Sequence, residues 1–288
     1  MKSGLLVLIL VASAMLPGCF KLKQEVTVMP DGSGKLTLTV SFNKKQLDEA
    51  FKSMPMGQPP KQANPTDIDT ENLEGFVAFA KPEKWTDDAG WEHTKITGYF
   101  EDINKVKVFH VENRAGEKKA WLSFTFKKQK DGGYYLECVD KFNTSEEQTK
   151  RADQMPPEME GMIMPTIEAA MKGMSLERSF LLPGEVTKAE DCTLMKGRVA
   201  SNVLESKDMK GVADFKKLGE NKHYKITCKK SAVTDIEAAA FRSEMDDAID
   251  AWEEMKKQAK KAAEEKEKAD KKAAEEKEKA EKKPAEAK

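Results

Sequence analysis

Hydrophobic and polar residues alternate along much of the chain between residues 26 and 138. Two alternating runs flank residues 30–34, which include a proline, an aspartate and two glycines, and two more flank Asp131, Gly132 and Gly133. Alternation with a period of two is typical of half-buried β-strands, and such turn residues between two runs are typical of tight turns. We therefore predict two β-hairpins, with the apolar positions Val26, Val28, Leu36, Leu38, Val40 and Phe42 in the first, and Leu122, Phe124, Phe126, Tyr134, Leu136 and Cys138 in the second.

Further patterns fill most of the chain up to residue 233. Strands are predicted at residues 91–100, 105–112, 179–182, 198–204 and 224–228, helices at residues 44–54 and 71–79, and a loop at the Pro-rich residues 55–65. Antiparallel hairpins with a few helices predict an α+β fold, in which the helices pack on one face of an antiparallel sheet. We expect a single ectodomain over residues 19–233, and the loop at 55–65 leaves two domains open.

A methionine-rich stripe changes the period of the pattern at residues 156–174. Apolar residues recur there at spacings of three and four, which predicts an amphipathic helix that Pro165 kinks or divides. Flexible, polarizable methionines are suited to an adaptable apolar surface that contacts a ligand, and the alternative is that they belong to the core. The candidate ligand surface is Met159, Met162, Ile163, Ile167 and Met171. Thioether binding of Cu(I) by Met54 and Met56, and by Met159, Met162 and Met164, is a further alternative.

A long helix is predicted from residue 235 to residue 283, before Pro284. Thr234 and Glu237 have the spacing of a capping box, and an apolar stripe of Phe241, Met245, Ala248, Trp252, Met255 and Ala259 follows and must pack against something. Beyond it, KKAAEEKEKAD at residues 260–270 recurs as KKAAEEKEKAE at 271–281, with Glu and Lys at the favoured i,i+4 order. This highly charged part has only alanines on its least polar face. It is either a solubilising tail or a binding site for an envelope protein or cell-wall partner.

The first residues have the pattern of an export signal, which we place at residues 1–18. Lys2 precedes an apolar run at residues 5–11 and small residues at 12–14. The sequence LPGC that follows resembles the lipobox of bacterial lipoproteins, with Leu16, Gly18 and Cys19 at the matching positions. The resemblance implies that the Cys19 thiol receives a diacylglycerol and that a peptidase cuts just before it. The alternative is an ordinary signal peptide that is cut elsewhere.

Acylation at Cys19 would attach the chain to a bacterial membrane on its exported side. Anchors with two or more acyl chains are stable, because burial contributes about 0.8 kcal/mol per methylene. The apolar run is too short for a transmembrane helix, which needs about 20 residues. Phe20 stands where an aspartate would indicate retention at the inner membrane in proteobacterial lipoproteins, so the choice between inner and outer membrane stays open.

The net charge, the histidines and the cysteines indicate which partners, metal sites and disulfides we expect. The 288 residues carry a formal net charge of -1 although 34% are charged, so we expect no nucleic-acid partner. His93, His110 and His223 are scattered along the chain, and we expect neither a metal site nor a cofactor. Export makes one disulfide plausible, for which we choose Cys192 and Cys228, while Cys138 packs as a small hydrophobic residue.

No motif for catalysis occurs in the chain. The nucleophile elbow GxSxG, the metalloprotease motif HExxH and the Walker motif are all missing from the sequence. We therefore expect a protein that is not an enzyme, and an unrecognised hydrolase that uses His110 beside a carboxylate is the alternative.

The acylatable cysteine, the turn sequence MPDGSG at residues 29–34 and LLPGEV at residues 181–186 together resemble the LppM-like group of bacterial lipoproteins. The resemblance covers roughly residues 19–230 and implies an α+β ectodomain similar to lipid-binding proteins. The chain departs from the group by a charged C-terminal helix in place of an apolar membrane segment, and only Cys19 carries over as a functional residue. We expect an anchored envelope lipoprotein that binds a lipid or other apolar ligand. The alternative is a scaffold that recruits a partner through the long helix.

Overall fold

The computed structural model describes residues 20–43, 72–112, 117–141, 173–205, 207 and 222–282. Several predictions concern positions outside these described residues. They are the signal peptide with Leu16, Gly18 and Cys19, the helix at 44–54, the loop at 55–65, and the methionine stripe with Met159, Met162, Ile163, Ile167 and Met171.

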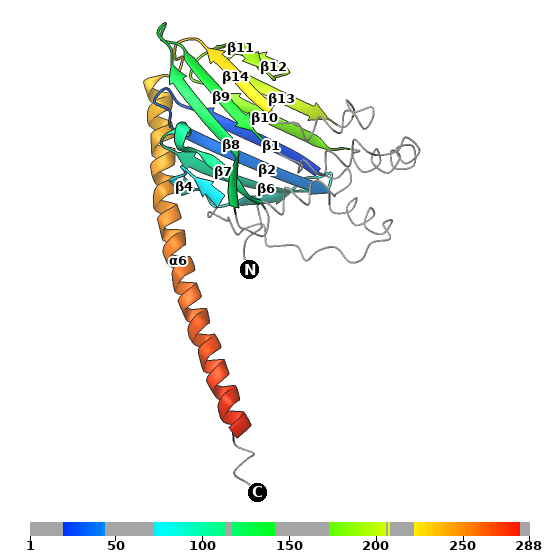
Figure 1. Cartoon of the computed structure of the whole chain (residues 1–288), viewed down its shortest axis with the longest axis vertical. Helices are drawn as coiled ribbons and strands as arrows, with labels where there is room; N and C mark the ends of the chain where they lie inside the picture. Colours follow the sequence, from blue (N-terminus) through cyan, green and yellow to red (C-terminus); the bar gives the residue numbers. More distant parts are fainter. Residues whose placement is uncertain are drawn as a thin grey trace, which may run out of the picture.

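The described strands form two sheets that face each other (Figure 1). An eight-stranded sheet has the order β12-β13-β10-β1-β2-β6-β4, with β5 also paired to β6. Its strands are β1 (Phe20–Val28), β2 (Gly34–Asn43), β4 (Ala78–Phe79), β5 (Glu83–Thr86), β6 (Trp91–Phe100), β10 (Ser175–Leu181), β12 (Leu194–Lys196) and β13 (Val199–Glu205). Neighbours in this sheet are antiparallel, except that β1 and β10 run parallel.

The second sheet has six strands in the order β11-β14-β9-β8-β7-β3, and its neighbours are all antiparallel. They are β3 (Leu73–Glu74), β7 (Lys107–Glu112), β8 (Glu117–Lys128), β9 (Tyr134–Asp140), β11 (Val186–Glu190) and β14 (Lys222–Cys228). Both predicted hairpins are confirmed as β1–β2 and β8–β9, and the strands predicted at 91–100, 105–112, 179–182, 198–204 and 224–228 correspond to β6, β7, β10, β13 and β14.

The two hairpins use the same turn chemistry. In the first, the Asp31 carboxylate accepts the backbone N–H of Ser33 at 3.1 Å, and Gly32 has a φ of 89°. In the second, Asp131 accepts the N–H of Gly133 at 2.9 Å, and Gly132 has a φ of 84°. An aspartate that accepts from the backbone two residues ahead, followed by a glycine at positive φ, makes a tight turn that most other residues would strain.

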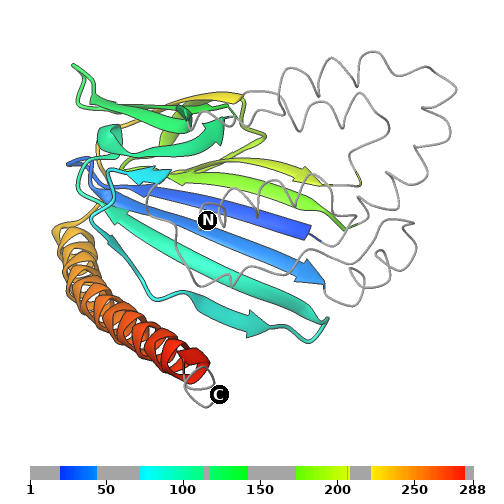
Figure 2. The ribbon, with the colours of Figure 1, turned by 60° about the horizontal axis from the view of Figure 1, so that its bottom comes forward.

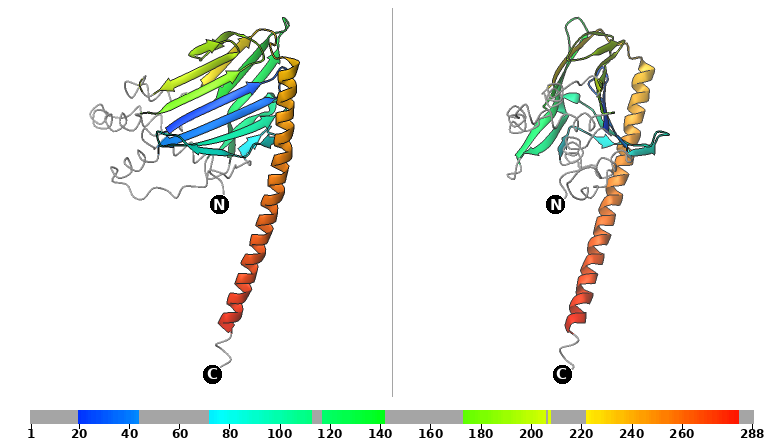
Figure 3. Two further views of the ribbon diagram at one scale, coloured as in Figure 1. Left: turned by 180° about the vertical axis from the view of Figure 1, so that it is seen from behind. Right: turned by 90° about the vertical axis from the view of Figure 1, so that its right-hand side faces the viewer.

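The two sheets face each other (Figure 2 and Figure 3), the main core lies between them, and a short turn closes one end of the sandwich. A 3-10 turn, η2 (Ile103–Lys105), closes the end at which both hairpins turn, and Ile103 and Val106 are fully buried there. The Ile103 N–H donates to the Gly32 carbonyl at 2.9 Å. We call this the closed end. At the opposite, open end, β1, β10 and β14 begin and β2, β9 and β13 finish.

The structure contains both strands and a helix, as the predicted α+β class requires, but the predicted arrangement with a few helices on one face of a single sheet needs correction, because the described part of the chain is mostly strand in two sheets. The helix predicted at residues 71–79 is wrong. This segment forms β3 and β4, and it crosses from the six-stranded to the eight-stranded sheet at Gly75, whose φ is 81°. Leu73, Phe76 and Phe79 recur at a spacing of three because all three enter the space between the sheets, so they imitate a helical period.

The predicted C-terminal helix is confirmed as α6 (Asp235–Lys282), together with its capping box. The Thr234 hydroxyl accepts the N–H of Glu237 at 3.2 Å, and the Glu237 carboxylate accepts the N–H of Thr234 at 2.8 Å. The predicted apolar stripe packs outside the eight-stranded sheet, where Phe241 and Ala248 are buried against Met29, Ala78 and Tyr99. Past this contact the helix runs away from the sheets (Figure 1). Among the described residues, no helix is both long and apolar enough to cross a membrane.

Candidate functional site

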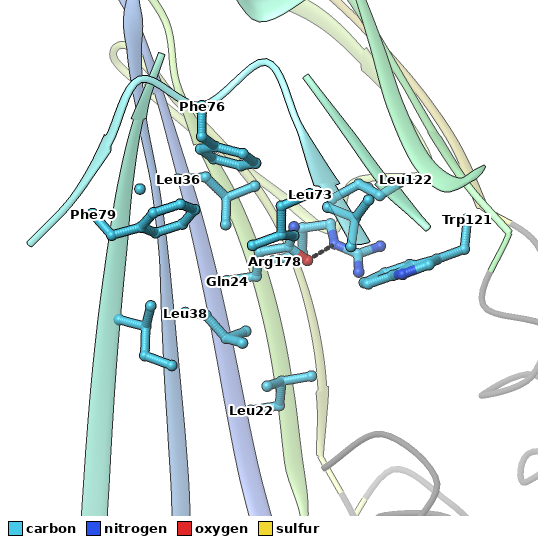
Figure 4. Close-up of a pocket in the computed structure, with 13 residues that line it drawn as sticks. Leu22, Gln24, Leu36, Leu38, Leu73, Phe76, Phe79, Trp121, Leu122 and Arg178 are labelled. Carbon is cyan, nitrogen blue, oxygen red and sulfur yellow. Dashed lines mark hydrogen bonds between the residues drawn. The ribbon is translucent and has the colours of Figure 1, made fainter. Parts of the chain in front are cut away.

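An apolar cavity of about 60 Å³ lies between the sheets, on the open side of the main core (Figure 4). Both sheets and the crossing segment supply its walls. They are Leu22, Gln24, Leu36, Leu38, Ile96, Gly98 and Arg178 from the eight-stranded sheet, Leu73, Val108, Trp121 and Leu122 from the six-stranded sheet, and Phe76 and Phe79. Gln24 and Arg178 are the only polar side chains in this lining.

Leucines on β1 and β2 point into the cavity, because alternate side chains of a strand lie on the same face. A glycine on β6 leaves space for two phenylalanine rings that form another wall. Leu22 on β1 and Leu36 and Leu38 on β2 occupy inward positions. A Cβ atom at Gly98 of β6 would lie 2.6 Å from the Phe76 ring and 2.8 Å from the Phe79 ring. Gly98 therefore lets both rings pack directly on the strand, with their centroids 5.2 Å apart.

A β-bulge adds Trp121 to the opposite wall. Val108 of β7 pairs with Leu122 of β8, but the next residue, Phe109, pairs with Ala120, so Trp121 is the extra residue. A bulge of this kind places two adjacent side chains against one residue of the neighbouring strand and re-aims the extra one. Trp121 and Leu122 consequently both line the cavity, with Trp121 beside Arg178 (Figure 4).

A buried polar cluster links the two sheets at the edge of the cavity. The Arg178 Nε donates to Gln24 Oε1 at 2.8 Å, and its Nη1 donates to Asp140 Oδ2 from the opposite sheet. The side chains of Arg178 and Asp140 are 14% and 5% exposed, and Asp140 Oδ1 has no partner in the described structure. Next to them, Asn202 donates to the Tyr224 hydroxyl at 3.3 Å, again between the sheets. The cluster therefore fixes the separation of the sheets where the core gives way to the cavity.

The size of the cavity limits what it can accept without a change in structure. About 60 Å³ is enough for a few water molecules, whereas pockets for drug-sized ligands have roughly 300–1,000 Å³. The crossing segment is the wall that is least firmly held, because β3 and β4 contribute only two paired residues each.

Sequence reasoning missed every polar residue of this site. A signal was nevertheless present, because Gln24 interrupts the inward apolar series of β1 and Arg178 that of β10, between Leu176 and Phe180. A polar residue at an inward strand position indicates either a buried polar pair or a ligand contact. Trp121 had no comparable signal, since a bulge is set by the pairing of strands and not by a local pattern.

The predicted disulfide between Cys192 and Cys228 is not formed in this structure, in which both residues and Cys138 are free thiols. Cys228 ends a buried strand of the main core, whereas Cys192 lies in the chain that crosses between β11 and β12 and packs against the same core. Burial raises the pKa of Cys138 to about 12 and that of Cys192 to about 11. These thiols are therefore protonated and weakly nucleophilic at neutral pH, and the expected packing of Cys138 in the core is confirmed.

One histidine lies in a chain of hydrogen bonds with a serine and an aspartate. The Ser41 hydroxyl is 2.7 Å from His93 Nδ1, and Asp87 Oδ2 is 3.2 Å from His93 Nε2. The N–H of Trp91 and the His93 ring lower the pKa of Asp87, against a smaller effect of desolvation. This order of groups matches a serine-hydrolase relay, but Ser41 is 4% exposed within the sheet, which leaves a substrate no approach to its hydroxyl. The described residues contain no metal-binding group of histidines, cysteines and carboxylates.

Comparison with known proteins adds little to this geometry. No protein-family model matches the chain, and no curated protein matches its sequence. Among solved structures, the NMR structure of the folded domain of the Mycobacterium tuberculosis LppM protein aligns with 77% of this chain and 95% of that one. The aligned residues are 10% identical and the TM-score is 0.33, a similarity too low to establish a shared fold.

Proposed function

We propose that the chain is a bacterial envelope lipoprotein, anchored through an acylated Cys19, whose ectodomain binds an apolar ligand between its two sheets. The cavity is the observation that carries the proposal, because protein interiors are normally close-packed. An empty apolar space of about 60 Å³ costs on the order of 1–2 kcal/mol at about 24 cal/mol per Å³. A hydrocarbon that fills it recovers this cost and gains about 0.8 kcal/mol for each further methylene that it buries.

The chemistry of the walls favours an unbranched hydrocarbon chain that enters with its tail first. The lining is almost entirely apolar, and the Arg178 charge is already compensated by Asp140. A ligand carboxylate in the cavity would find the only charged group of the lining already paired and would lose its hydration without a free cation in return. The polar head of an amphiphile therefore stays at the entrance, and an acyl chain of a lipid is the ligand class that fits.

Native mass spectrometry of the chain from residue 20 to 288, purified from a bacterial envelope without detergent, tests the proposal. The chain includes α6 because Phe241 and Ala248 complete a core on the sheet. We expect a stoichiometric bound lipid in the wild type, and its loss in Leu38→Trp, which fills the cavity. Leu194→Trp is the matched control, since Leu194 is 53% exposed and far from the lining. Equal lipid content in all three proteins would contradict binding in this cavity.

A scaffold function is the second candidate, and the exposed part of α6 favours it. Between residues 256 and 271, the helix residues whose burial the structure describes are all exposed, and the charged repeat begins within this range, at residue 260. A helix of 48 residues is about 72 Å long at about 1.5 Å per residue, so its far end would reach a partner well away from the sheets. Removal of residues 260–288 leaves the packed stripe in place, and unchanged recovery of partners from the envelope would eliminate this candidate.

A further inference from the structure

The outer face of the eight-stranded sheet is divided into a covered and an uncovered half. Near the closed end, α6 covers Tyr99 and Ala78. Toward the open end, the same face carries Trp85, whose residue is 43% exposed although it is one of the largest apolar side chains in the chain. A single exposed tryptophan is common on protein surfaces, so the residues around Trp85 decide whether it marks an interaction site.

Trp85 is held rigidly by a row of residues that crosses four strands. The backbone register pairs Trp85 of β5 with His93 of β6, His93 with Ser41 of β2, and Ser41 with Lys21 of β1. The Trp85 indole stacks on the His93 ring, with centroids 4.7 Å apart and planes inclined by 10°. Because Ser41 and Asp87 hydrogen-bond the two nitrogens of that ring, the indole rests on a fixed platform rather than on a mobile side chain.

A second tryptophan and a lysine lie on the same face close to the start of β1. The Lys21 ammonium is 4.0 Å from the centroid of the Trp91 ring. Lys21 follows Cys19 by two residues, which span at most about 7 Å. Trp85 is three strands away from β1, which corresponds to roughly 14 Å. Both tryptophans and Lys21 are therefore within a short reach of Cys19.

We infer that Trp85 and Lys21, with Lys21 lying over the buried ring of Trp91 (8% exposed), rest on the surface of the lipid bilayer to which Cys19 is attached; these three residues are here called the tryptophan face. The inference relies on the anchor of the proposed function. Tryptophan and lysine both prefer the membrane–water interface, where an apolar ring or stem is buried and the polar end stays hydrated. Lys95 is paired with Glu83 at 2.8 Å and Asp87 with His93, so the Trp85 indole rather than net charge supplies the attraction.

The orientation that follows connects this face with the cavity. The tryptophan face lies at the open end of the sandwich, where β1 begins, and Leu22 of the cavity wall is on the same strand. Because α6 covers the closed-end half of the same outer face, only the open-end half can rest on the bilayer, so the sandwich is tilted with its open end nearer to the membrane than its closed end. An acyl chain could then pass from the bilayer to the cavity without crossing water.

The test uses the full-length acylated chain in vesicles of phosphatidylethanolamine and phosphatidylglycerol that contain brominated acyl chains, which quench tryptophan on contact. We expect strong quenching in the wild type and in Trp252→Phe, because Trp252 packs on Phe79 under α6. We expect most of the quenching to be lost in Trp85→Phe. Equal quenching in Trp85→Phe and wild type would overturn the inference and leave the face to a protein partner.

A second measurement separates this inference from the anchor. The unacylated Cys19→Ser chain should bind the same vesicles weakly, and Trp85→Ala in that background should weaken binding on the order of tenfold, with little dependence on salt. Ile236→Ala is the control, since Ile236 is 82% exposed at the start of α6. Unchanged binding on Trp85→Ala would reject the tryptophan face. Vesicle binding of the wild type that survives Cys19→Ser at full strength would reject the anchor alone.

Discussion

The two ends of the sandwich are built from the same strands, yet only one is fully packed. On β1, Val26 and Val28 are 1% and 0% exposed near the closed end, whereas Leu22 and Gln24 toward the open end line a cavity. The closed end is where both hairpins turn and where η2 inserts Ile103. Local turns thus give one end a dense core that holds the strands together, and the other end is left with space that a ligand can use.

Substitutions at the boundary between these ends should reduce the free energy of unfolding most, and Arg178→Met tests this. The substitution leaves Asp140 buried without its cation, so the free energy of unfolding should fall by about 3–5 kcal/mol. Urea denaturation measures this loss. The double variant Arg178→Met with Asp140→Leu should recover most of it, because it removes the orphaned charge together with its partner. A single variant as stable as the wild type would show that the ion pair does not hold the sheets.

A matched pair of alanine substitutions compares the ends directly. Ile103→Ala removes a fully buried side chain from the closed end and should cost about 2–5 kcal/mol in the free energy of unfolding. Leu38→Ala enlarges a cavity that already exists, so its cost should lie at or below the lower limit of that range. Urea midpoints at equal slope give both values. The comparison fails if Leu38→Ala proves the more destabilising of the two.

The smallest effect on stability is expected at α6, which covers the outer face of the eight-stranded sheet near the closed end. Glu244 of α6 accepts from Lys35 at 2.6 Å and from Tyr99 at 2.8 Å, and these bonds lower its pKa although partial burial opposes them. A lowered folded-state pKa gives stability that is present above the unfolded value of about 4.3 and is lost as the pH falls through the folded-state pKa. Glu244→Gln should therefore remove part of the loss of stability at acidic pH. The free energy concerned is well under 1 kcal/mol, because the ion pair is partly exposed.

Thermal melts between neutral and acidic pH measure this last effect. Glu254→Gln, an exposed glutamate farther along the same helix, serves as the control and should leave the acid profile unchanged. If Glu244→Gln and wild type lose stability over the same acidic range, the contact of α6 with the sheet contributes nothing to the pH dependence.

The sequence predicted those elements whose signal is local. The β1–β2 and β8–β9 hairpins follow from alternation and an aspartate–glycine turn, and α6 follows from its capping box and apolar stripe. The face-to-face sheets, the bulge at Trp121 and the crossing segment at 73–79 depend on partners far along the chain, so no local pattern encodes them. Leu73, Phe76 and Phe79 even gave a false helical period.

The candidate site was harder to predict than the fold for the same reason. Arg178 meets Asp140 and Gln24 only because β10 pairs with β1 and the second sheet lies opposite. Ser41, Asp87 and His93 likewise come from separate strands and a turn. A short sequence motif can reveal a site that a single segment forms, whereas each of these two sites is formed by three separate segments.

The parallel pairing of β1 with β10 also sets the order in which the sheet can be completed. Lys21 pairs with Ser175, so the second edge of β1 stays open until a segment about 150 residues farther along the chain has reached it. An unpaired strand edge invites pairing with other chains. On β1, Lys21, Lys23 and Glu25 occupy the outer face during this interval, and charges on an exposed edge are the usual protection against aggregation. β1 is thus the first of the described strands to be made and among the last to be enclosed.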